Sequence, residues 1–306
     1  MTGTDRQGRN GAGTGMQGGS GSDAIAVRGL TKRYRDFTLD SISFRVPKGV
    51  IMGFVGENGA GKTTTIKAIL DLIHIDEGEI TVLGYPAAGL PKEVKASMGV
   101  VFDGSSLHDN LNVAGTGLIM KNIYPNWDSK VFEQYVKRFE LPEKKIVKDF
   151  SRGMKMKLSI AIALSHHARL LILDEATSGL DPMVRDEILD LFLEFIQEED
   201  HTILLSSHII SDIEKIADYV TFIHKGRIVF SESKDELIYQ YGVIHCRRED
   251  VPGIDRNYVV GIRENNFGAE VMIKKKGEFV KHYRQYQVER TSIEEIMLFI
   301  SKGKEL

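Results

Sequence analysis

The sequence is poor in cysteine and in long apolar runs. Its single cysteine, Cys246, rules out an internal disulfide in this chain of 306 residues, and a lone thiol is typical of a reducing compartment. No uninterrupted apolar run approaches the roughly 18 to 20 residues that a membrane-spanning helix needs. Even the stretch from Leu158 to Leu164 is soon followed by His166 and His167. We therefore expect a chain that does not cross a bilayer.

Excess charge is also missing. The formal net charge of -3 gives no global reason to expect nucleic acid as a partner, so any recognition of phosphate should be local. Residues 1–23 are dominated by glycine with small polar residues, and they lack the apolar centre of a secretory signal. We interpret them as a flexible tail. The composition of the whole chain, 42% hydrophobic and 27% charged, indicates a globular protein of one or two domains.

Beyond residue 24, strand-like and helix-like segments alternate. The apolar run at 49–55 predicts a central, buried strand, and a helix is predicted over residues 62–73. A largely helical stretch from about 110 to 168 interrupts the alternation, which resumes with the strand "LLILDE" at 170–175. This rhythm predicts an α/β sheet. After about residue 240 the composition shifts to short strands and a terminal helix, which predicts a small separate β-rich module.

The segment "GENGAGKTT" lies between the buried strand and the helix predicted from Lys62. It contains G-x-x-x-x-G-K-[ST] in the strand–loop–helix context that this motif requires. Glycines allow successive backbone N–H groups to turn inward as an anion nest, Lys62 reaches the β- and γ-phosphates, and Thr63 offers its hydroxyl to Mg²⁺. The predicted cradle comprises Gly56, Glu57, Asn58, Gly59, Ala60, Gly61, Lys62, Thr63 and Thr64.

Two carboxylates follow the strand "LLILDE". Because ligands of open α/β sheets bind at the carboxyl ends of the strands, Asp174 is predicted to hold Mg²⁺, directly or through a water. Glu175 is the best candidate to polarise an attacking water, since hydrolysis needs an acceptor besides the metal-binding carboxylate. Alone, the two acids could merely cap a loop; beside a phosphate loop the catalytic interpretation is favoured.

A second helix start carries charges of unexpected sign. The segment "DFSRGMKMKLSIAIA" predicts an apolar helix whose first turns hold Arg152, Lys155 and Lys157, where the backbone dipole favours negative charge. One small nucleotide seldom needs two helix starts from the same molecule. A head-to-tail dimer with two shared ATP sites satisfies both. The alternative interpretation is that Ser151 is an ordinary N-cap among surface lysines.

Five motifs in this order resemble the ATP-binding subunits of ABC transporters over roughly residues 25–236. They are "GENGAGKTT", "FSRGM", "LLILDE", "SGLD" at 178–181 and "LSSH" ending at His208. The resemblance implies a P-loop NTPase core with an antiparallel β subdomain and a helical insert. We therefore expect an ABC-type ATP-binding domain over 24–240, with its helical subdomain at about 110–168, and a C-terminal accessory module over 241–306.

The resemblance also implies roles for individual residues. His208 is expected to touch the γ-phosphate and to hold the water and Glu175 in place, Tyr34 to stack on adenine, and Asp181 to couple the two sites across the dimer. The signature residues expected to contact the ATP of the partner subunit are Ser151, Arg152, Gly153 and Met154. Among these, Arg152 and Met154 depart from the commoner glycine and glutamine.

A further departure from the family pattern is Asp103, at the end of the strand that closes with "VVFD". The family usually presents a glutamine there, which reaches both Mg²⁺ and the membrane partner. Aspartate is shorter and charged. Asp103 is therefore a candidate metal-side residue acting through a water, beside the alternative that it caps a loop.

The expected function is that of an ATPase, a motor subunit at the cytoplasmic face of the cell membrane. Two copies, or this chain with a close relative, would hydrolyse Mg-ATP and drive export through a separate integral membrane protein. The stretch 151–182 looks most like exporter subunits for peptides, drugs or antibiotics. A groove around residues 103–125, with Trp127 at its edge, should receive the partner's coupling helix, although aromatics there could equally belong to the subdomain core.

Two other classes of function compete with this one. An ATPase of this family could do mechanical or regulatory work with a membrane partner without moving a solute, and ATP-dependent uptake into vesicles would separate the two. A P-loop kinase is the third possibility. Nothing in the sequence resembles an acceptor pocket or lid, and a kinase would leave the signature and His208 unexplained.

Overall fold

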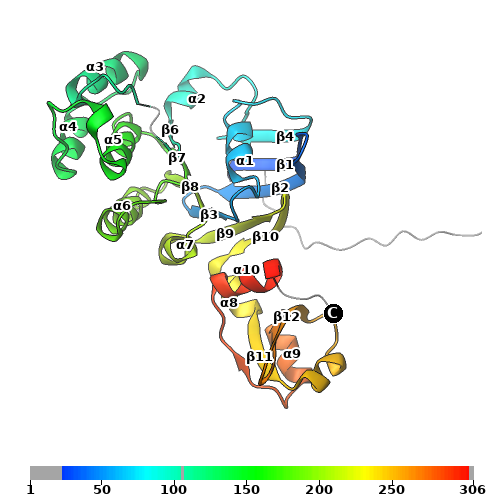
Figure 1. Ribbon diagram of the computed structural model, residues 1–306. Helices are drawn as coiled ribbons and strands as arrows, with labels where there is room; N and C mark the ends of the chain where they lie inside the picture. The colour runs from blue at the N-terminus through cyan, green and yellow to red at the C-terminus, as the bar shows by residue number, and fades with distance from the viewer. Residues whose placement is uncertain (1–22, 105–106, 303–306) are drawn as a thin grey trace, which may run out of the picture.

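The computed structural model describes residues 23–104 and 107–302, so nearly all of the predicted tail at 1–23 lies outside the described residues. Three β-sheets and their helices form a central body, a helical part on one side of it and a C-terminal part below it (Figure 1). Among the described residues, no helix is long and apolar enough to cross a bilayer.

The central sheet has six strands in the order β10-β9-β3-β8-β7-β6. All neighbours are parallel except β10, which pairs antiparallel with β9. Every residue of β3, β7 and β8 is buried, as continuously apolar parallel strands require. The strands are β3 (Ile51–Val55), β6 (Met98–Val101), β7 (Leu170–Asp174), β8 (Thr202–Ser207), β9 (Tyr219–His224) and β10 (Arg227–Ser233).

A second, antiparallel sheet packs over one face of the first, with α1 (Lys62–Ile69) contacting strands of both sheets. Its order is β2-β1-β4-β5, and one hydrophobic cluster joins it to α1 and to the central strands. The strands are β1 (Asp23–Arg33), β2 (Thr38–Pro47), β4 (Glu77–Val82) and β5 (Tyr85–Pro86).

Helix α1 is shorter than the prediction of residues 62–73. It ends at Ile69, because Leu70 caps it and Asp71 adopts a left-handed backbone with φ 56°. The carboxylate of Asp71 accepts the backbone N–H of Gly89 at 3.2 Å, which ties this turn to the following loop. The prediction of a longer helix was wrong because the residues after Ile69 form a turn instead.

The other face of the central sheet is covered by helices. The core of this layer includes the buried side of α5 and the apolar residues of α6 and α7. Trp127 packs on Phe132 with 5.1 Å between ring centroids, so it belongs to the helical part's own packing. The elements are α3 (Val113–Ile123), α4 (Ser129–Arg138), the 3-10 turn η1 (Val147–Asp149), α5 (Arg152–Leu164), α6 (Pro182–Phe195) and α7 (Ile210–Ile216); α2 (Lys92–Ala96) instead packs its Val94 in the cluster of the antiparallel sheet and α1.

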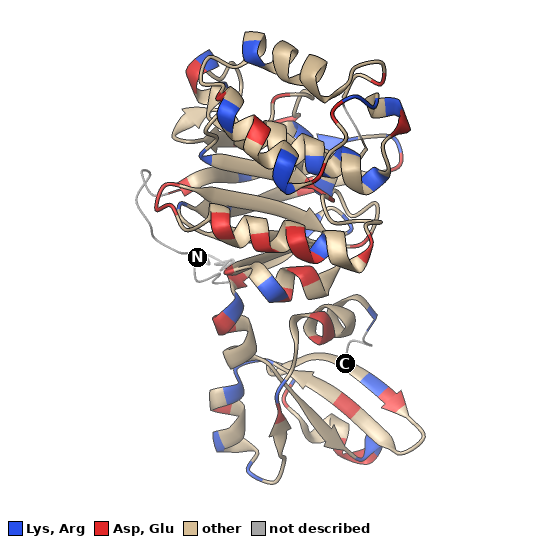
Figure 2. Ribbon diagram, turned by 90° about the vertical axis from the view of Figure 1, so that its left-hand side faces the viewer, with Lys and Arg blue, Asp and Glu red and all other residues tan. Residues whose placement is uncertain are grey.

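Ion pairs link these helices to one another. Figure 2 faces this side of the molecule and shows acidic residues along its helices. Three acids of α6 each pair with a cation of a different helix: Asp186 with Lys215 of α7, Glu187 with Lys157 of α5, and Glu194 with Arg138 of α4. The pairs of Asp186 and Glu194 are exposed and contribute little individually, so the apolar layer beneath them provides most of the stability.

The C-terminal part contains a third sheet in the order β12-β13-β11-β14. One face packs on α9 and the 3-10 turn η2, and the other packs on α10, whose apolar residues join the large core cluster. On the core side, the carboxylate of Glu214 accepts the N–H of Ile293 at 2.7 Å. The elements are α8 (Lys234–Gln240), β11 (Gly242–Cys246), η2 (Arg248–Gly253), β12 (Val259–Asn265), β13 (Gly268–Ile273), α9 (Lys276–His282), β14 (Val288–Glu289) and α10 (Ile293–Lys302).

Candidate phosphate-binding site

The loop between β3 and α1 has the backbone that an anion nest needs. Gly59 and Gly61 have φ values of 81° and 115°, and a Cβ at Gly56 would lie 2.4 Å from the carbonyl oxygen of Ile223. Helix α1 begins after Gly61 without a side-chain cap, so its first N–H groups are available to a ligand. Free amides at a helix N-terminus form a phosphate-binding arrangement.

Lys62 lies at the centre of this loop and is only 5% exposed. Its Nζ donates to the carbonyl oxygen of Gly56 at 2.7 Å and pairs with Oε1 of Glu175 at 3.1 Å. A buried cation needs such partners, because desolvation without them is costly. The loop therefore carries the positive charge of Lys62, and the carboxylate that pairs with it, Glu175, directly follows strand β7.

Asp174 is buried at the end of β7 between two hydroxyl groups. Its Oδ2 accepts a hydrogen bond from Thr63 at 2.8 Å, and its Oδ1 accepts one from Ser206 of β8 at 2.9 Å. Burial raises the pKa of the Asp174 carboxyl, and the two hydroxyl donors oppose that rise. Sequence reasoning missed Ser206; its signal was the pair of serines that closes the buried strand "TILLSS".

The Thr63–Asp174 pair fits a magnesium ion. A hydroxyl and a carboxylate oxygen lie side by side at the phosphate loop, and oxygen is the ligand type that Mg²⁺ prefers. The described residues contain no group of three or more His, Cys, Asp or Glu side chains suited to a metal. A magnesium ion here would therefore take most of its ligands from phosphate and water, as Mg²⁺ commonly does.

Glu175 and His208 face one another beside the loop. Nδ1 of His208 lies 2.6 Å from Oε2 of Glu175, and since a carboxylate only accepts, Nδ1 carries the proton. Glu175 has a left-handed backbone with φ 54°, and its N–H donates to the carbonyl of Ser206 at 3.0 Å. Strained conformations of this kind cluster at functional sites. The single carboxylate of Glu175 thus bridges Lys62 and His208.

A cavity of about 520 Å³ lies over the phosphate loop. Phe37 and Asp36 are among the described residues that line this cavity, and Tyr34 is not. Tyr34 is 47% exposed, with Lys32 placed over its ring at 5.5 Å. The role of Tyr34 at adenine stays a prediction, and Phe37, which is three residues further along the chain, is an aromatic that sequence reasoning missed.

The first turns of α5 carry three cations at the end of the helix where the backbone dipole disfavours positive charge. Arg152 pairs with Asp103 at 2.6 Å, Lys155 with Asp109 at 3.4 Å and Lys157 with Glu187 at 2.7 Å. Each cation thus has an acidic partner within its own chain, which offsets the unfavourable helix dipole.

Ser151 is the N-cap of α5, since its Oγ accepts the N–H of Met154 at 3.2 Å. A hydroxyl that accepts one hydrogen bond still has its own proton to donate, so capping and binding an anion are compatible. Gly153 lies against the start of α6, where a Cβ would be 3.5 Å from Val184. The proposed contact of these residues with a second subunit's nucleotide stays a prediction.

Asp181 and Asp103 have defined local roles. Asp181 caps α6 through the N–H of Val184 at 3.1 Å, with Pro182 in the first helical turn as the sequence predicts. Asp103 lines the cavity over the phosphate loop, yet its carboxylate is bound to Arg152. Its predicted action on a metal is therefore in competition with an ion pair that sequence reasoning did not foresee.

Comparison with known proteins places this site in context. The family model described as ABC transporter matches residues 39–178. The bacitracin transport ATP-binding protein BcrA of Bacillus licheniformis is 37% identical over 219 residues, which is 71% of this chain and 72% of that protein. The lantibiotic transport ATP-binding protein SrtF of Streptococcus pyogenes is 32% identical over 69% of this chain and 91% of its own length.

Solved structures agree with these relatives. A structure described as the ATP-binding subunit of an ABC transporter superimposes with a TM-score of 0.64 at 27% identity, covering 71% of this chain and 92% of that one.

Proposed function

The chain belongs to the ATP-binding subunits of ABC transporters, and from that membership we propose that it lies at the cytoplasmic face of the membrane and powers export of a peptide or antibiotic through a separate membrane-spanning protein. As a member of this family it is an ATPase. The observation that supports ATP hydrolysis is the single carboxylate of Glu175, held between the phosphate-loop lysine and His208, and export rests on the likeness to BcrA and SrtF.

The geometry supports a hydrolytic mechanism in which each side chain has one task. The backbone amides at the start of α1 and Lys62 bind the phosphates. Once the phosphates attract Lys62, Glu175 is left as the acceptor for a water proton, within hydrogen-bond reach of His208. His208 can serve Glu175 through Nδ1 and a phosphate through Nε2 together only when both ring nitrogens carry protons.

Magnesium would be held by Thr63 and Asp174. Bound there, Mg²⁺ supplies charge neutralisation for the phosphates of ATP. Asp174 must be ionised for this role, and its two hydroxyl partners favour the ionised form against the effect of burial. Ser206 is thus a positioning residue, because it orients the carboxylate from the neighbouring strand.

Members of this family dimerise and work with a membrane partner, and we propose a head-to-tail dimer in which the start of α5 completes the ATP site of a second subunit. The placement of Ser151 supports this. Its hydroxyl is exposed at an N-terminus with a proton left to donate, and no described residue of its own chain accepts that proton. Whether the second subunit is an identical copy or a relative does not alter this geometry.

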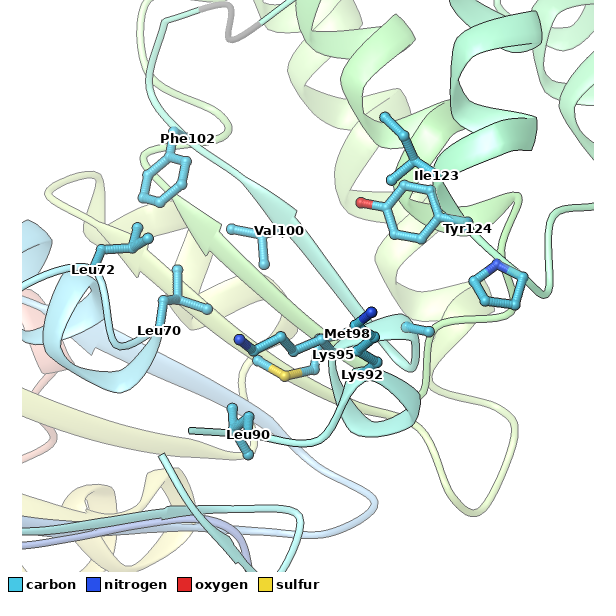
Figure 3. Close-up of a pocket in the computed structure, with 12 residues that line it drawn as sticks. Leu70, Leu72, Leu90, Lys92, Lys95, Met98, Val100, Phe102, Ile123 and Tyr124 are labelled. Carbon is cyan, nitrogen blue, oxygen red and sulfur yellow. The ribbon is translucent and has the colours of Figure 1, made fainter. Parts of the chain in front are cut away.

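The membrane partner is proposed to dock in an apolar groove of about 520 Å³ between the central body and the helical part (Figure 3). Among the described residues that line it, the predicted stretch 103–125 contributes only its end, at 123–125, and the other lining residues come from 70–72, 90–96 and 98–102. Trp127 lines a different cavity, with Phe132. The apolar lining consists of Leu70, Leu72, Leu90, Ala96, Met98, Val100, Phe102, Ile123, Tyr124 and Pro125.

The substitution Glu175→Gln tests the proposal with two readouts. We expect ATP hydrolysis to fall by about 10²- to 10⁴-fold, because the acceptor for the water proton is lost, while ATP binding persists. In vesicles that contain the co-purified membrane partner, ATP-driven accumulation of a bacitracin-like peptide should stop with hydrolysis. The control is Glu199→Gln at an exposed glutamate after α6. Hydrolysis by Glu175→Gln at the wild-type rate would show that Glu175 is not the acceptor. If the unsubstituted chain hydrolyses ATP but the vesicles show no ATP-dependent uptake, the export role is wrong.

A further inference from the structure

Two residues that depart from the family pattern touch one another. By the resemblance of the motifs, Asp103 stands where a glutamine is expected and Arg152 where a glycine is expected. Their side chains form an ion pair with 2.6 Å between Nη2 and Oδ1. The two positions are 49 residues apart in sequence. We propose that Arg152 exchanges partners during the ATPase cycle, from Asp103 of its own chain to the terminal phosphate of ATP bound by the second subunit.

Arg152 lies where three parts of the chain meet. It is the first residue of α5, and its carboxylate partner Asp103 follows β6. Its guanidinium also covers Gly179 in the "SGLD" turn, where a Cβ would lie 2.7 Å from Nη1. Gly179 has φ 66°, so both the conformation and the close approach favour glycine. The guanidinium of Arg152 therefore lies against this turn, and its Nη2 donates to the carboxylate of Asp103.

Asp103 connects this ion pair to the chain's own phosphate loop. It lines the cavity over that loop together with Thr63 and Glu175, and it also lines a second polar cavity of about 460 Å³ at the start of α5, with Arg152 and Lys155. The chain's own ATP site and the helix start that serves the other ATP site thus share one carboxylate. Release of Arg152 changes the charge at both.

The ion pair is suited to exchange rather than to stabilising the fold. Both side chains are 50% exposed, and pairs so exposed contribute little to the free energy of unfolding. A terminal phosphate carries more charge than a carboxylate, and the planar guanidinium can bind two of its oxygens at once. The phosphate should therefore displace Asp103 when a second subunit brings its nucleotide to the start of α5.

This inference rests on the proposed function, because it requires a dimer with shared ATP sites. The test measures the ATP concentration that gives half-maximal dimerisation in the Glu175→Gln background, by light scattering at saturating Mg²⁺. Asp103→Asn frees Arg152 in advance, so we expect about two- to five-fold less ATP to suffice. Arg152→Gln removes the phosphate contact, so we expect about ten-fold more to be needed.

The opposite signs separate exchange from a merely structural ion pair, since loss of a structural pair would shift both variants in the same direction. The double variant Asp103→Asn/Arg152→Gln should behave like Arg152→Gln alone. The neighbouring pair of Lys155 and Asp109, on the same helix, provides the matched control: Asp109→Asn should leave the half-maximal concentration unchanged.

Each outcome has one meaning. If no ATP-dependent dimer forms even in the Glu175→Gln background, the shared-site function itself fails. If the dimer forms but Asp103→Asn and Arg152→Gln shift in the same direction, or neither shifts, the exchange is wrong and the proposed function stands. Because both side chains are half exposed, unfolding midpoints close to that of the parent chain are expected and serve as the check on folding.

Discussion

The starts of α1 and α5 are the two helix N-termini that the sequence predicts to bind phosphate, and they are built in opposite ways. At α1 the cation Lys62 is buried, the helix has no side-chain cap, and a carboxylate from β7 faces it. At α5 the N-cap Ser151 is in place, and the cations are exposed or half-buried and paired with acids of their own chain. The start of α1 leaves its first N–H groups to a ligand, whereas the start of α5 is capped and its cations are paired within the chain.

The largest expected effect breaks the α1 side of this comparison. Lys62→Ala should weaken ATP binding by about 10- to 100-fold, because it removes charge-assisted hydrogen bonds to the phosphates. Isothermal titration with Mg-ATP measures this directly. Lys67→Ala, at an exposed lysine in the last turn of the same helix, is the control and should bind ATP as the parent chain does. Unchanged affinity in Lys62→Ala would mean that the buried lysine has only a structural role.

A smaller effect is expected at α5. Ser151→Arg should leave ATP binding by the single chain intact and raise the ATP needed for dimerisation of the Glu175→Gln chain by about ten-fold, which corresponds to about 1.4 kcal/mol. The larger side chain occupies the surface that meets the second subunit, and the free hydroxyl is lost. Ser129→Arg places the same substitution in the first turn of α4 as a control. Dimerisation of Ser151→Arg at the parental ATP concentration would contradict the shared site.

The smallest expected effect concerns the buried carboxylate of Asp174, which lies beside the start of α1. Burial raises the pKa of Asp174 in the folded chain above its unfolded value, so the stability linked to this group is present at low pH and is lost as pH rises through the folded pKa. Asp174→Asn should therefore raise Tm at pH 7 by about 2 to 4 °C, or about 1 kcal/mol. The gain should shrink as pH falls toward 4.

Differential scanning calorimetry across this pH range measures the effect of Asp174→Asn. The matched control is Asp149→Asn, at an exposed aspartate just before α5, where a change below about 0.5 kcal/mol is expected. A Tm of Asp174→Asn that lies below the parent at every pH would show that the two hydroxyl hydrogen bonds outweigh the cost of burying the charge.

The comparison also explains which features could be predicted from sequence. The phosphate loop and the alternation of elements are local, because glycine conformations and apolar runs are set by neighbouring residues. The cap of α6 at Asp181 was predicted for the same reason. The partners of Arg152 and Asp174 were not, because Asp103 and Ser206 are distant in sequence and meet only through sheet order and side-chain direction.

The wrong end of the first helix, and the points that the sequence leaves open, have similar causes. The end of α1 depends on the left-handed turn at Asp71, a conformation that few non-glycine residues adopt, although aspartate adopts it more often than most. Trp127 has an aromatic side chain that suits either a groove or a core, and only its packing on Phe132 distinguishes them. Tyr34 and Phe37 are three residues apart in a turn, so the sequence gives no direction for either ring.

The return of α10 to the central body has a consequence for the order in which the chain folds. Ile293, Ile296 and Phe299 are fully buried in the same cluster as residues of α7, and the N–H of Ile293 is bound by Glu214, 79 residues earlier. During synthesis, that apolar surface must stay in contact with water until α10 has been made. Contacts of such long sequence separation form slowly, so the growing chain passes through a period in which it is open to aggregation or to chaperone binding.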